Sequence, residues 1–240
     1  MSAKPQCPQA APRATTIRQY KDGTWESQPD VLSREIPIRI HTDNALPKTL
    51  WAWPCNLEDL ALGHVLLDMG GAGRAATVTT LNDTEFEVKL GEPLSPETGT
   101  PAPIAGPVLL KAMADFMGGE GLWDDTGCFH RAGVLNPVSM QVLHRAEDIG
   151  RHNCLDRLAG WASRSGEELS DKVLLVSARV TSSLCAKALR AGFRFIISRS
   201  AVTTASVDMA TEHGATLVGF ARDREGRFSV FADEAGRVIE

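Results

Sequence analysis

Hydrophobic and polar residues follow clear rhythms in the first half of the chain. Residues 34–41 alternate between polar and apolar, which predicts a half-buried strand. In residues 57–68 the apolar positions recur close to helical spacing, and Asn56 is the predicted capping residue. Two short β-prone runs, at 77–81 and 85–90, flank Asn82-Asp83 and therefore predict a β-hairpin.

The C-terminal half has a different pattern, in which short continuous apolar runs alternate with segments of helical periodicity. The runs have the length of strands, and uninterrupted apolar character is typical of strands buried on both faces. The alternation therefore predicts an α/β fold built on parallel strands. The predicted elements are strands at 173–177, 193–198 and 216–220, helices at 181–189 and 204–213, and an edge strand at 228–231.

The same patterns predict where the chain divides. Residues 1–33 are polar and show no periodicity, which predicts a disordered tail. Residues 91–106 are dense in Pro, Gly, Ser and Thr, as in a linker, and Pro107 suits the first turn of the next helix. The expected parts are a tail (1–33), an N-terminal α+β domain ending in the Pro/Gly-rich loop (34–106), and a C-terminal α/β domain (107–240).

Composition narrows the class of protein. The 240 residues carry a formal net charge of -5, which argues against a protein that coats nucleic acid. No apolar run approaches the roughly 20 residues of a bilayer crossing, and the N-terminus lacks a secretory pattern, so we expect a cytoplasmic protein without a membrane partner. The five cysteines are odd in number and scattered, which favours reduced thiols over a disulfide framework or a zinc ribbon.

Arginine and hydroxyl residues follow the carboxyl ends of the predicted parallel strands. Ligands of open α/β sheets bind outside these ends, and the helix N-termini there favour anions. Because guanidinium groups match phosphate geometry, we expect a pocket for a phosphate-bearing ligand; the alternative is that these arginines are ordinary solvated strand ends. The residues concerned are Ser177, Arg179, Ser198, Arg199, Ser200, Phe220, Ala221, Arg222, Arg224 and Arg227.

Residues 147–153 form the densest polar segment, with two carboxylates, a guanidinium, an imidazole and an amide around one glycine. A helix start needs one capping side chain, so the surplus indicates a bound polar or charged ligand. Asn153 is the predicted cap of a helix over residues 154–162. Glu147 and Asp148 either accept hydrogen bonds from a purine or ribose or pair with local arginines. The candidate ligand residues are Glu147, Asp148, Gly150, Arg151, His152 and Asn153.

A second polar cluster spans residues 126–130. Cys128 stands two residues before His130, an arrangement that suits a thiolate with a nearby proton acceptor. The alternative is a buried thiol beside a hydrogen-bonded imidazole. The H-x-E and P-C-x-x-C patterns of zinc deaminases are absent from the sequence, and no metal site is predicted.

Taken together, these motifs resemble the FdhD family of formate dehydrogenase accessory sulfurtransferases. The strongest match is segment 147–153 followed by Asp156, supported upstream by Thr126-Gly127 and His130. Residues 57–63 resemble the N-terminal helix of the family, and the strand-end residues fit its downstream pattern. The resemblance runs from about Ile36 to the C-terminus.

The resemblance implies a sulfur carrier that accepts persulfide sulfur from a cysteine desulfurase. It implies that the sulfur passes to molybdenum (or tungsten) bis-molybdopterin guanine dinucleotide, the cargo destined for apo formate dehydrogenase or a related molybdoenzyme. It further implies a homodimer, a smaller α+β N-terminal domain, and a C-terminal domain of three layers similar to cytidine deaminases. That C-terminal domain binds the cargo, so GDP-like nucleotides are suitable probes. Its contacts with the cargo are expected to extend from residues 220–222 to Gly226 and Arg227.

The chain departs from the family at one functional loop. Typical members carry a C-G-x-C-G loop, whereas residues 94–107 of this chain contain no cysteine. Sulfur transfer needs a thiolate that can hold a persulfide, which makes Cys128 the candidate persulfide residue with His130 beside it. Two alternatives stay open. One is a cofactor chaperone without covalent chemistry, and the other is a nucleotide-acting hydrolase that uses Glu147, Asp148 and His152 as acid or base.

Overall fold

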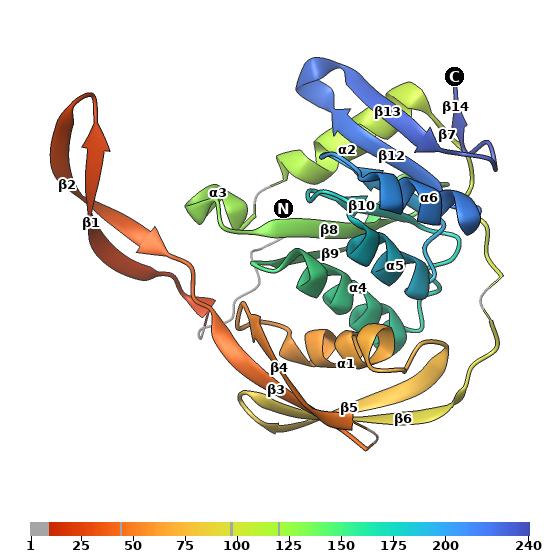
Figure 1. Ribbon diagram of the computed structural model, residues 1–240, viewed down its shortest axis with the longest axis horizontal. Coiled ribbons are helices and arrows are strands. Elements are labelled where there is room, and N and C mark those ends of the chain that lie inside the picture. Colours follow the sequence, from red (N-terminus) through yellow and green to blue (C-terminus); the bar gives the residue numbers. More distant parts are fainter. Residues whose placement is uncertain (1–9, 44, 97, 120) are drawn as a thin grey trace.

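A six-stranded mixed sheet lies at the centre of the molecule (Figure 1). The computed structural model describes residues 10–43, 45–96, 98–119 and 121–240. The strand order is β13-β12-β11-β10-β8-β9, with β10, β11 and β12 parallel and the remaining neighbours antiparallel. The strands are β8 (His130–Leu135), β9 (Val142–Asp148), β10 (Val173–Val176), β11 (Phe195–Ser198), β12 (Thr216–Arg222) and β13 (Arg227–Ala232).

Helices cover both faces of this sheet. One apolar cluster joins the sheet to α4 (Arg151–Ser165), α5 (Ser182–Arg190) and α6 (Thr204–Glu212). A second cluster joins its opposite face to α2 (Gly106–Gly118). Every residue of β10 and β11 is buried, as expected of strands covered on both sides. The predicted α/β class and the three layers of the C-terminal half are therefore confirmed.

A second, four-stranded sheet carries the N-terminal part of the chain, in the order β4-β3-β6-β5. Helix α1 (Leu57–Asp68) lies between this sheet and α4 (Figure 1). Ile38, Ile40 and Val88 of the sheet pack against Leu60 and Val65 of the helix. The strands are β3 (Ile36–Thr42), β4 (Ala45–Ala52), β5 (Arg74–Asn82) and β6 (Glu85–Pro93). The strand predicted at 34–41, which begins two residues later in the structure, the helix and the hairpin around Asn82-Asp83 are therefore confirmed.

The sequence-based prediction failed for two parts of the chain. Residues 1–33 were expected to be disordered, but β1 (Arg13–Lys21) and β2 (Thr24–Leu32) form a hairpin; residues 1–9 lie outside the described part. Nearly all residues of its strands are exposed, so the half-buried alternation on which strand prediction depends is absent. Strands β8 and β9 were not predicted, since Gly133 weakens the pattern of β8. A Cβ on Gly133 would lie 2.6 Å from the Phe116 ring of α2, so the packing favours glycine there.

The two predicted caps fared differently. Asn56 occupies the predicted N-cap position of α1, but it has a φ of 48° and makes no capping hydrogen bond with its side chain. Helix α4 begins at Arg151 after Gly150, so Asn153 lies inside its first turn. The predicted linker at 91–106 contains the end of β6 and β7 (Ile104–Ala105), which pairs with β14 (Val238–Ile239). Pro107 stands in the first turn of α2, as predicted. The short helices are α3 (Trp123–Thr126) and the 3₁₀ turn η2 (Asp223–Glu225).

Helices α1 and α4 cross at two glycines. A Cβ on Gly63 would lie 1.7 Å from the carbonyl oxygen of Asp156, and one on Gly160 would lie 2.0 Å from that of Asp59. Backbone atoms cannot yield as a flexible side chain can. The two glycines therefore allow α1 to pack closely on α4. Through this contact they set how near the N-terminal sheet lies to the central sheet.

We expect Gly63→Ala to lower the free energy of unfolding by about 3 kcal/mol or more, since overpacking costs about 1–3 kcal/mol and backbone contacts are the least yielding. Urea denaturation measures this change. Gly118→Ala is the matched control, because Gly118 also lies in a helix and a Cβ there would meet no atom within 4 Å. Equal stability of the two variants would contradict the close crossing of α1 and α4.

No helix among the described residues combines the length and apolar character needed to cross a lipid bilayer.

Candidate functional site

The predicted ligand residues lie along one edge of the central sheet. Strands β10, β11 and β12 are parallel neighbours, so Arg179, Arg199 and Arg222 follow, or stand at, their carboxyl ends on the same edge. The antiparallel strand β8 begins at this edge, where His130 pairs in register with Asp148 at the end of β9. The sheet therefore brings together segments separated by up to about ninety positions in the sequence.

Asp148 is fully buried and is held by the protein itself. Its Oδ2 accepts hydrogen bonds from Nε of Arg157 at 2.9 Å and from Nη2 at 2.5 Å. Its Oδ1 accepts bonds from the Gly150 amide and from Nδ2 of Asn153, both at 2.9 Å. Asn153 also donates to the carbonyl of Trp51 at 2.9 Å. Asp148 and Asn153 thus bind α4 to the preceding turn and to the N-terminal segment.

Arg157 completes this buried group. It donates to the backbone carbonyls of Trp53 at 2.8 Å and Asn56 at 3.1 Å, and also to that of Cys55. Sequence reasoning missed Arg157, because an arginine within a helix gives no sign that it turns inward. A Cβ on Gly150 would lie 3.0 Å from the Asn153 amide nitrogen, so Gly150 allows that side chain to approach.

Glu147 has a comparable structural partner. Its Oε1 accepts a hydrogen bond from Nε of Arg131 at 2.5 Å, and its Oε2 accepts one from the Leu122 amide at 3.1 Å. The buried Arg131 also donates to the carbonyls of Met117 and Gly119 and to Asp124. Of the two interpretations of Glu147 and Asp148 that the sequence left open, the structure favours pairing with local arginines.

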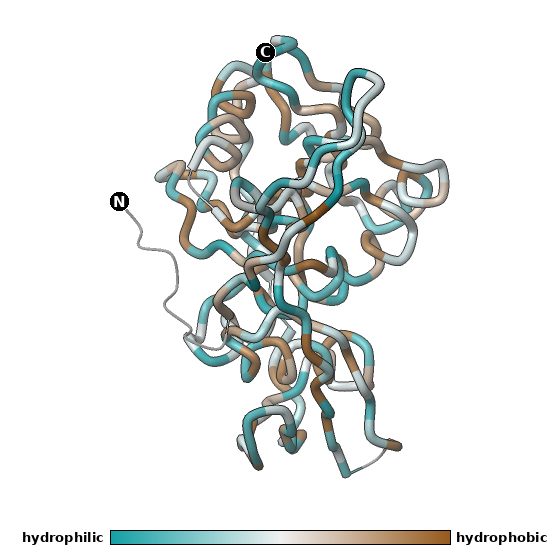
Figure 2. Tube along the Cα trace, turned by 90° about the vertical axis from the view of Figure 1, so that its left-hand side faces the viewer, coloured by the Kyte–Doolittle hydropathy of each residue, from teal (hydrophilic) through white to brown (hydrophobic). Residues whose placement is uncertain are grey.

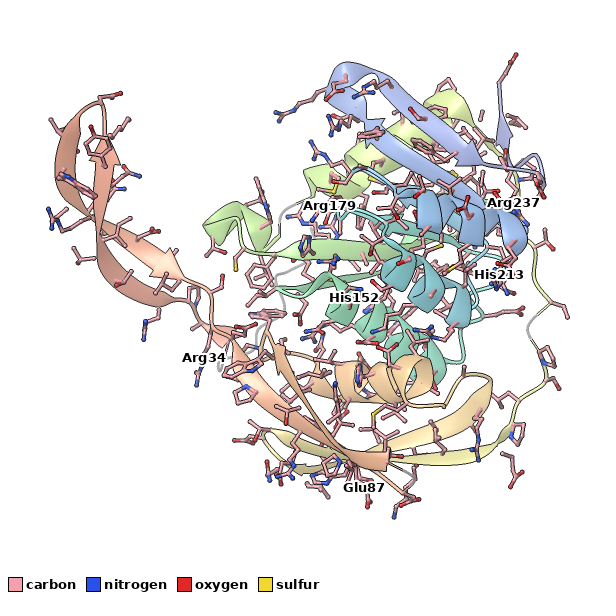
Figure 3. All side chains as sticks on the ribbon, viewed as in Figure 1. Arg34, Glu87, His152, Arg179, His213 and Arg237 are labelled. Atoms are coloured by element: carbon pink, nitrogen blue, oxygen red, sulfur yellow. The ribbon has the colours of Figure 1, made fainter. Side chains whose placement is uncertain are left out.

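Arg151 and Arg179 create a positive environment around His130. Burial and then the positive charges of Arg151 and Arg179 lower the pKa of the His130 imidazole. Arg179 is exposed, whereas Arg151 is half-buried and its Nε is enclosed without a hydrogen-bond partner among the described residues. Figure 3 shows Arg179 and His152 at the same end of the sheet, near β8 and the start of α4. Because that Nε is buried, an anion arriving from solvent can bind only to the accessible part of the Arg151 side chain and to the exposed Arg179.

His152 connects this region to the start of α5. Its Nε2 lies 3.1 Å from Oγ of Ser183, which is itself 3.2 Å from Oγ1 of Thr181, the residue that precedes α5. Burial, Arg151 and Lys187 lower the pKa of His152, in that order. The N-termini of α4 and α5 therefore both border the site, and their free amides favour a negatively charged ligand.

The serines at the carboxyl ends of β10 and β11 mainly make hydrogen bonds to the backbone of neighbouring loops and strands. Oγ of Ser177 accepts a hydrogen bond from the Arg131 amide at 2.9 Å. The buried Ser198 hydroxyl donates to the Ala178 carbonyl at 2.8 Å and accepts from the Ser200 amide at 2.9 Å. The Ser200 carbonyl accepts the Phe220 amide at 2.9 Å. These bonds hold the loops after β10, β11 and β12 together.

A second group of cations surrounds Phe220. The Arg222 and Arg227 guanidinium groups lie 5.4 and 5.3 Å from the centre of the Phe220 ring. Both pair with Glu225, at 2.8 and 2.6 Å. Phe220 has a φ of 52°, which is strained for a bulky residue and is typical of functional sites. Ala221 beside it is buried, and Gly226 (φ 60°) closes the turn between β12 and β13.

The cysteines differ sharply in exposure. Cys55 is disulfide-bonded, so the expectation of reduced thiols is wrong for this residue. Among the described free cysteines, Cys154 and Cys185 are buried and Cys128 is exposed. Burial raises the pKa of Cys154 far above its usual value and that of Cys185 to about 11. Only an exposed thiol can meet a sulfur donor, and Cys128 meets that condition.

One group of possible metal ligands occurs among the described residues, formed by His64, Asp68 and Asp156. The buried ammonium of Lys187 lies among them, 2.8 Å from Oδ2 of Asp68 and 2.6 Å from Oδ1 of Asp156. The ammonium already supplies the positive charge that these carboxylates need. The group is therefore an ion-pair cluster that links α1, α4 and α5.

Comparison with known proteins places the chain in a family. Residues 69–239, well over half of the chain, match the model of the FdhD/NarQ family. A sulfur carrier protein FdhD from Geobacillus kaustophilus is 27% identical over 264 residues, covering 95% of this chain and 98% of that protein. The protein of the same name from Bacillus subtilis is 36% identical over 122 residues, covering 51% and 45%.

A solved structure shares the fold. The crystal structure of a formate dehydrogenase accessory protein from Desulfotalea psychrophila superimposes with a TM-score of 0.80. The alignment covers 95% of this chain and 99% of that chain at 20% sequence identity. From the family model and these relatives, we conclude that the chain belongs to the FdhD/NarQ family.

Proposed function

We propose that the protein is an accessory factor in formate dehydrogenase maturation. In this role it binds the guanine-nucleotide form of the molybdenum cofactor as cargo and delivers it to the apo-enzyme. Membership of the FdhD/NarQ family supports the accessory role. The observation that carries the cargo proposal is the pair of half-buried and exposed arginines, Arg151 and Arg179, beside His130.

The chemistry of this edge suits a pyrophosphate group. Arg151 is the first residue of α4, and the side chain of His152, the second residue, reaches Ser183 in the first turn of α5. Guanidinium groups and free helix amides are the usual ligands of phosphate oxygens in proteins. Phe220, flanked by Arg222 and Arg227, presents an aromatic surface on the same edge. Such a surface can stack on a nucleotide base.

Sulfur transfer is the second part of the proposal. The Cys128 thiolate attacks the terminal sulfur of a persulfide on a cysteine desulfurase and releases the desulfurase thiolate. The new Cys128 persulfide then holds the sulfur for the cofactor. Exposure of Cys128 supports this role, and His130, whose lowered pKa favours the neutral imidazole, stands two residues away to accept the thiol proton. The desulfurase, the apo-enzyme and the homodimer are partners that the proposal predicts.

A chaperone without sulfur transfer is the alternative, and one observation favours it: residues 94–107 contain no cysteine. Nucleotide hydrolysis has less support. Glu147 and Asp148, its proposed acid and base, are bonded to Arg131 and Arg157, which leaves His152 without a free carboxylate partner in this segment. Turnover of GDP would restore the hydrolase interpretation.

Calorimetry with GDP tests the cargo site. We expect Arg151→Ala and Arg179→Ala each to weaken GDP binding by about 1–3 kcal/mol, the usual worth of a charged hydrogen bond. Arg199→Ala and Arg222→Ala are expected to act in the same direction and within the same range. Arg164→Ala is the control, because Arg164 lies in the last turn of α4, far along the helix from Arg151. Unchanged affinity in all four site variants would return these arginines to the role of solvated strand ends.

The same titration, repeated after thiol blocking, separates the two parts of the proposal. Binding that survives blocking assigns GDP recognition to the arginines alone. Loss of binding would place Cys128 inside the nucleotide pocket.

A further inference from the structure

A cavity of about 710 Å³ lies at the carboxyl ends of three helices. It is lined by the last turns of α1, α4 and α5 and by residues that follow them. Helix α4 has 15 residues and is therefore about 22 Å long, and its other end borders the candidate site. The volume falls within the roughly 300–1,000 Å³ of ordinary small-molecule sites. The cavity is therefore a binding-site candidate that is separate from the sheet edge.

The cavity lies where α1 and the N-terminal sheet meet the larger C-terminal part, the two lobes seen in Figure 2. The connection from β6 to β7 runs along one side of the molecule (Figure 1) and lines the cavity. The Leu94 amide donates to the Gly73 carbonyl at 2.7 Å, and the Gly99 amide donates to Oε1 of Glu168 at 3.0 Å. A Cβ on Gly99 would lie 2.5 Å from Oγ of Ser170, so the connection packs closely there. Hydrogen bonds at both ends thus hold this wall of the cavity in place.

The floor of the cavity is apolar. It includes Leu66 and Leu67 of α1, Ala162 of α4 and Leu189 of α5. These four residues are between 4% and 9% exposed, because they pack in the core and border the cavity at the same time. An apolar ligand placed on them would lose contact with water, which favours its binding.

Three of the five charged residues that line the cavity already have partners. Glu167 pairs with Lys172 at 3.0 Å, and Glu168 accepts the amide of the wall. Arg190 pairs with Asp68 at 2.8 Å. These groups form the rim of the cavity and do not require a ligand.

Arg74 and Arg194 are the other two charged residues, and both donate to backbone carbonyls. Nε and Nη2 of Arg74 lie 3.0 and 2.7 Å from the Gly91 carbonyl. Nη1 of Arg194 donates to three carbonyls within residues 189–193, at 3.0–3.2 Å. Neither guanidinium pairs with a carboxylate in the part of the chain that the structure describes. The end of α5 carries only about half a negative charge, so it offsets part of one guanidinium. The cavity therefore keeps a net positive side.

We propose that this cavity binds an organic anion with an apolar body. The body lies on the leucine and alanine floor, and the charged end pairs with Arg74 and Arg194. A guanidinium has five N–H donors, so one that already serves a carbonyl can still donate to an anionic oxygen. This inference goes beyond the proposed function and uses none of the residues of the cofactor site.

Fluorescence titration with 1-anilinonaphthalene-8-sulfonate tests the cavity on the full chain. This probe is an aromatic anion whose emission rises when it leaves water. We expect saturable binding and displacement of the probe by decanoate. Decanol has the same apolar body without the charge, and we expect it to compete about 10-fold less well, since a charged hydrogen bond is lost.

Two variants locate the site. Arg74→Gln is expected to weaken decanoate binding about 10-fold, because it removes one of the two cations. Ser163→Trp is expected to abolish binding of probe and decanoate, since Ser163 is exposed, lines the cavity and would fill it with an indole. Arg164→Gln and Ser165→Trp are the matched controls. Both residues are exposed on the same helix and do not line the cavity.

Three results would overturn the proposal. Equal competition by decanoate and decanol would remove the arginines from recognition. Equal probe binding by Ser163→Trp and Ser165→Trp would place the probe elsewhere, and a wild-type protein that binds no probe would leave the cavity without a ligand. Circular dichroism checks that each variant folds. GDP binding is expected to be the same in all of them, so failure here is distinguishable from failure of the cofactor proposal.

Discussion

Cys128→Ser is expected to abolish loading of persulfide sulfur from a cysteine desulfurase while GDP binding survives. A serine hydroxyl cannot hold a sulfane sulfur, and the other described free thiols are buried. Burial raises the pKa of both Cys154 and Cys185, so neither supplies a thiolate at neutral pH. The measurement is the sulfur transferred to the purified protein, with alkylation to count the persulfides.

Cys185→Ala is the matched control, because it removes a free thiol that a donor cannot reach. Its loading is expected to equal that of the wild type. Full loading of Cys128→Ser would remove this residue from the mechanism. Absence of loading in the wild-type protein would favour the chaperone without sulfur transfer.

Arg157→Met is expected to cost about 3–5 kcal/mol of unfolding free energy, the penalty of leaving a buried charge without its partner. The substitution keeps much of the side-chain volume but leaves the fully buried Asp148 without the guanidinium. It also removes the donors to the carbonyls of Trp53 and Asn56. The loss of unfolding free energy therefore shows how much the contact between α4 and the N-terminal segment stabilises the protein. Urea denaturation measures it.

Arg164→Met in the same helix is the control. Arg164 pairs with the exposed Glu58 and with Asp59, and its own side chain is 49% exposed; ion pairs of a solvent-exposed arginine contribute only about 0–1 kcal/mol. A loss below about 1 kcal/mol for Arg157→Met would mean that water or a rearranged side chain compensates Asp148. It would also reopen the interpretation of Asp148 as a ligand residue.

The C-terminal strands were predictable because their signal is local. Residues 173–176 and 195–198 are continuous apolar runs, and the structure buries all of them. The β1–β2 hairpin was not predictable, since nearly all residues of its strands face solvent and the pattern therefore lacks half-buried positions. Asp22-Gly23 was the available signal, and it becomes persuasive only when flanked by strands.

The candidate site was also only partly predictable from local sequence patterns. Parallel topology alone implied that Arg179, Arg199 and Arg222 share an edge, and the structure has them there. The sequence could not tell that Asp148 and Asn153 are internal contacts, because their partners, Arg157 and the Trp51 carbonyl, are chosen by three-dimensional packing. Asn153 was therefore mistaken for a cap.

By itself, the sequence of this protein determined its family, its α/β class and the shared sheet edge of Arg179, Arg199 and Arg222. These depend on periodicity, composition and motif, which are local properties of a chain. Only the tertiary structure decided which polar groups are free to meet a ligand. It bonded Glu147, Asp148 and Asn153 within the protein and left the Cys128 thiol exposed. The reason is physical: a buried polar group must find its partner wherever the packed chain provides one.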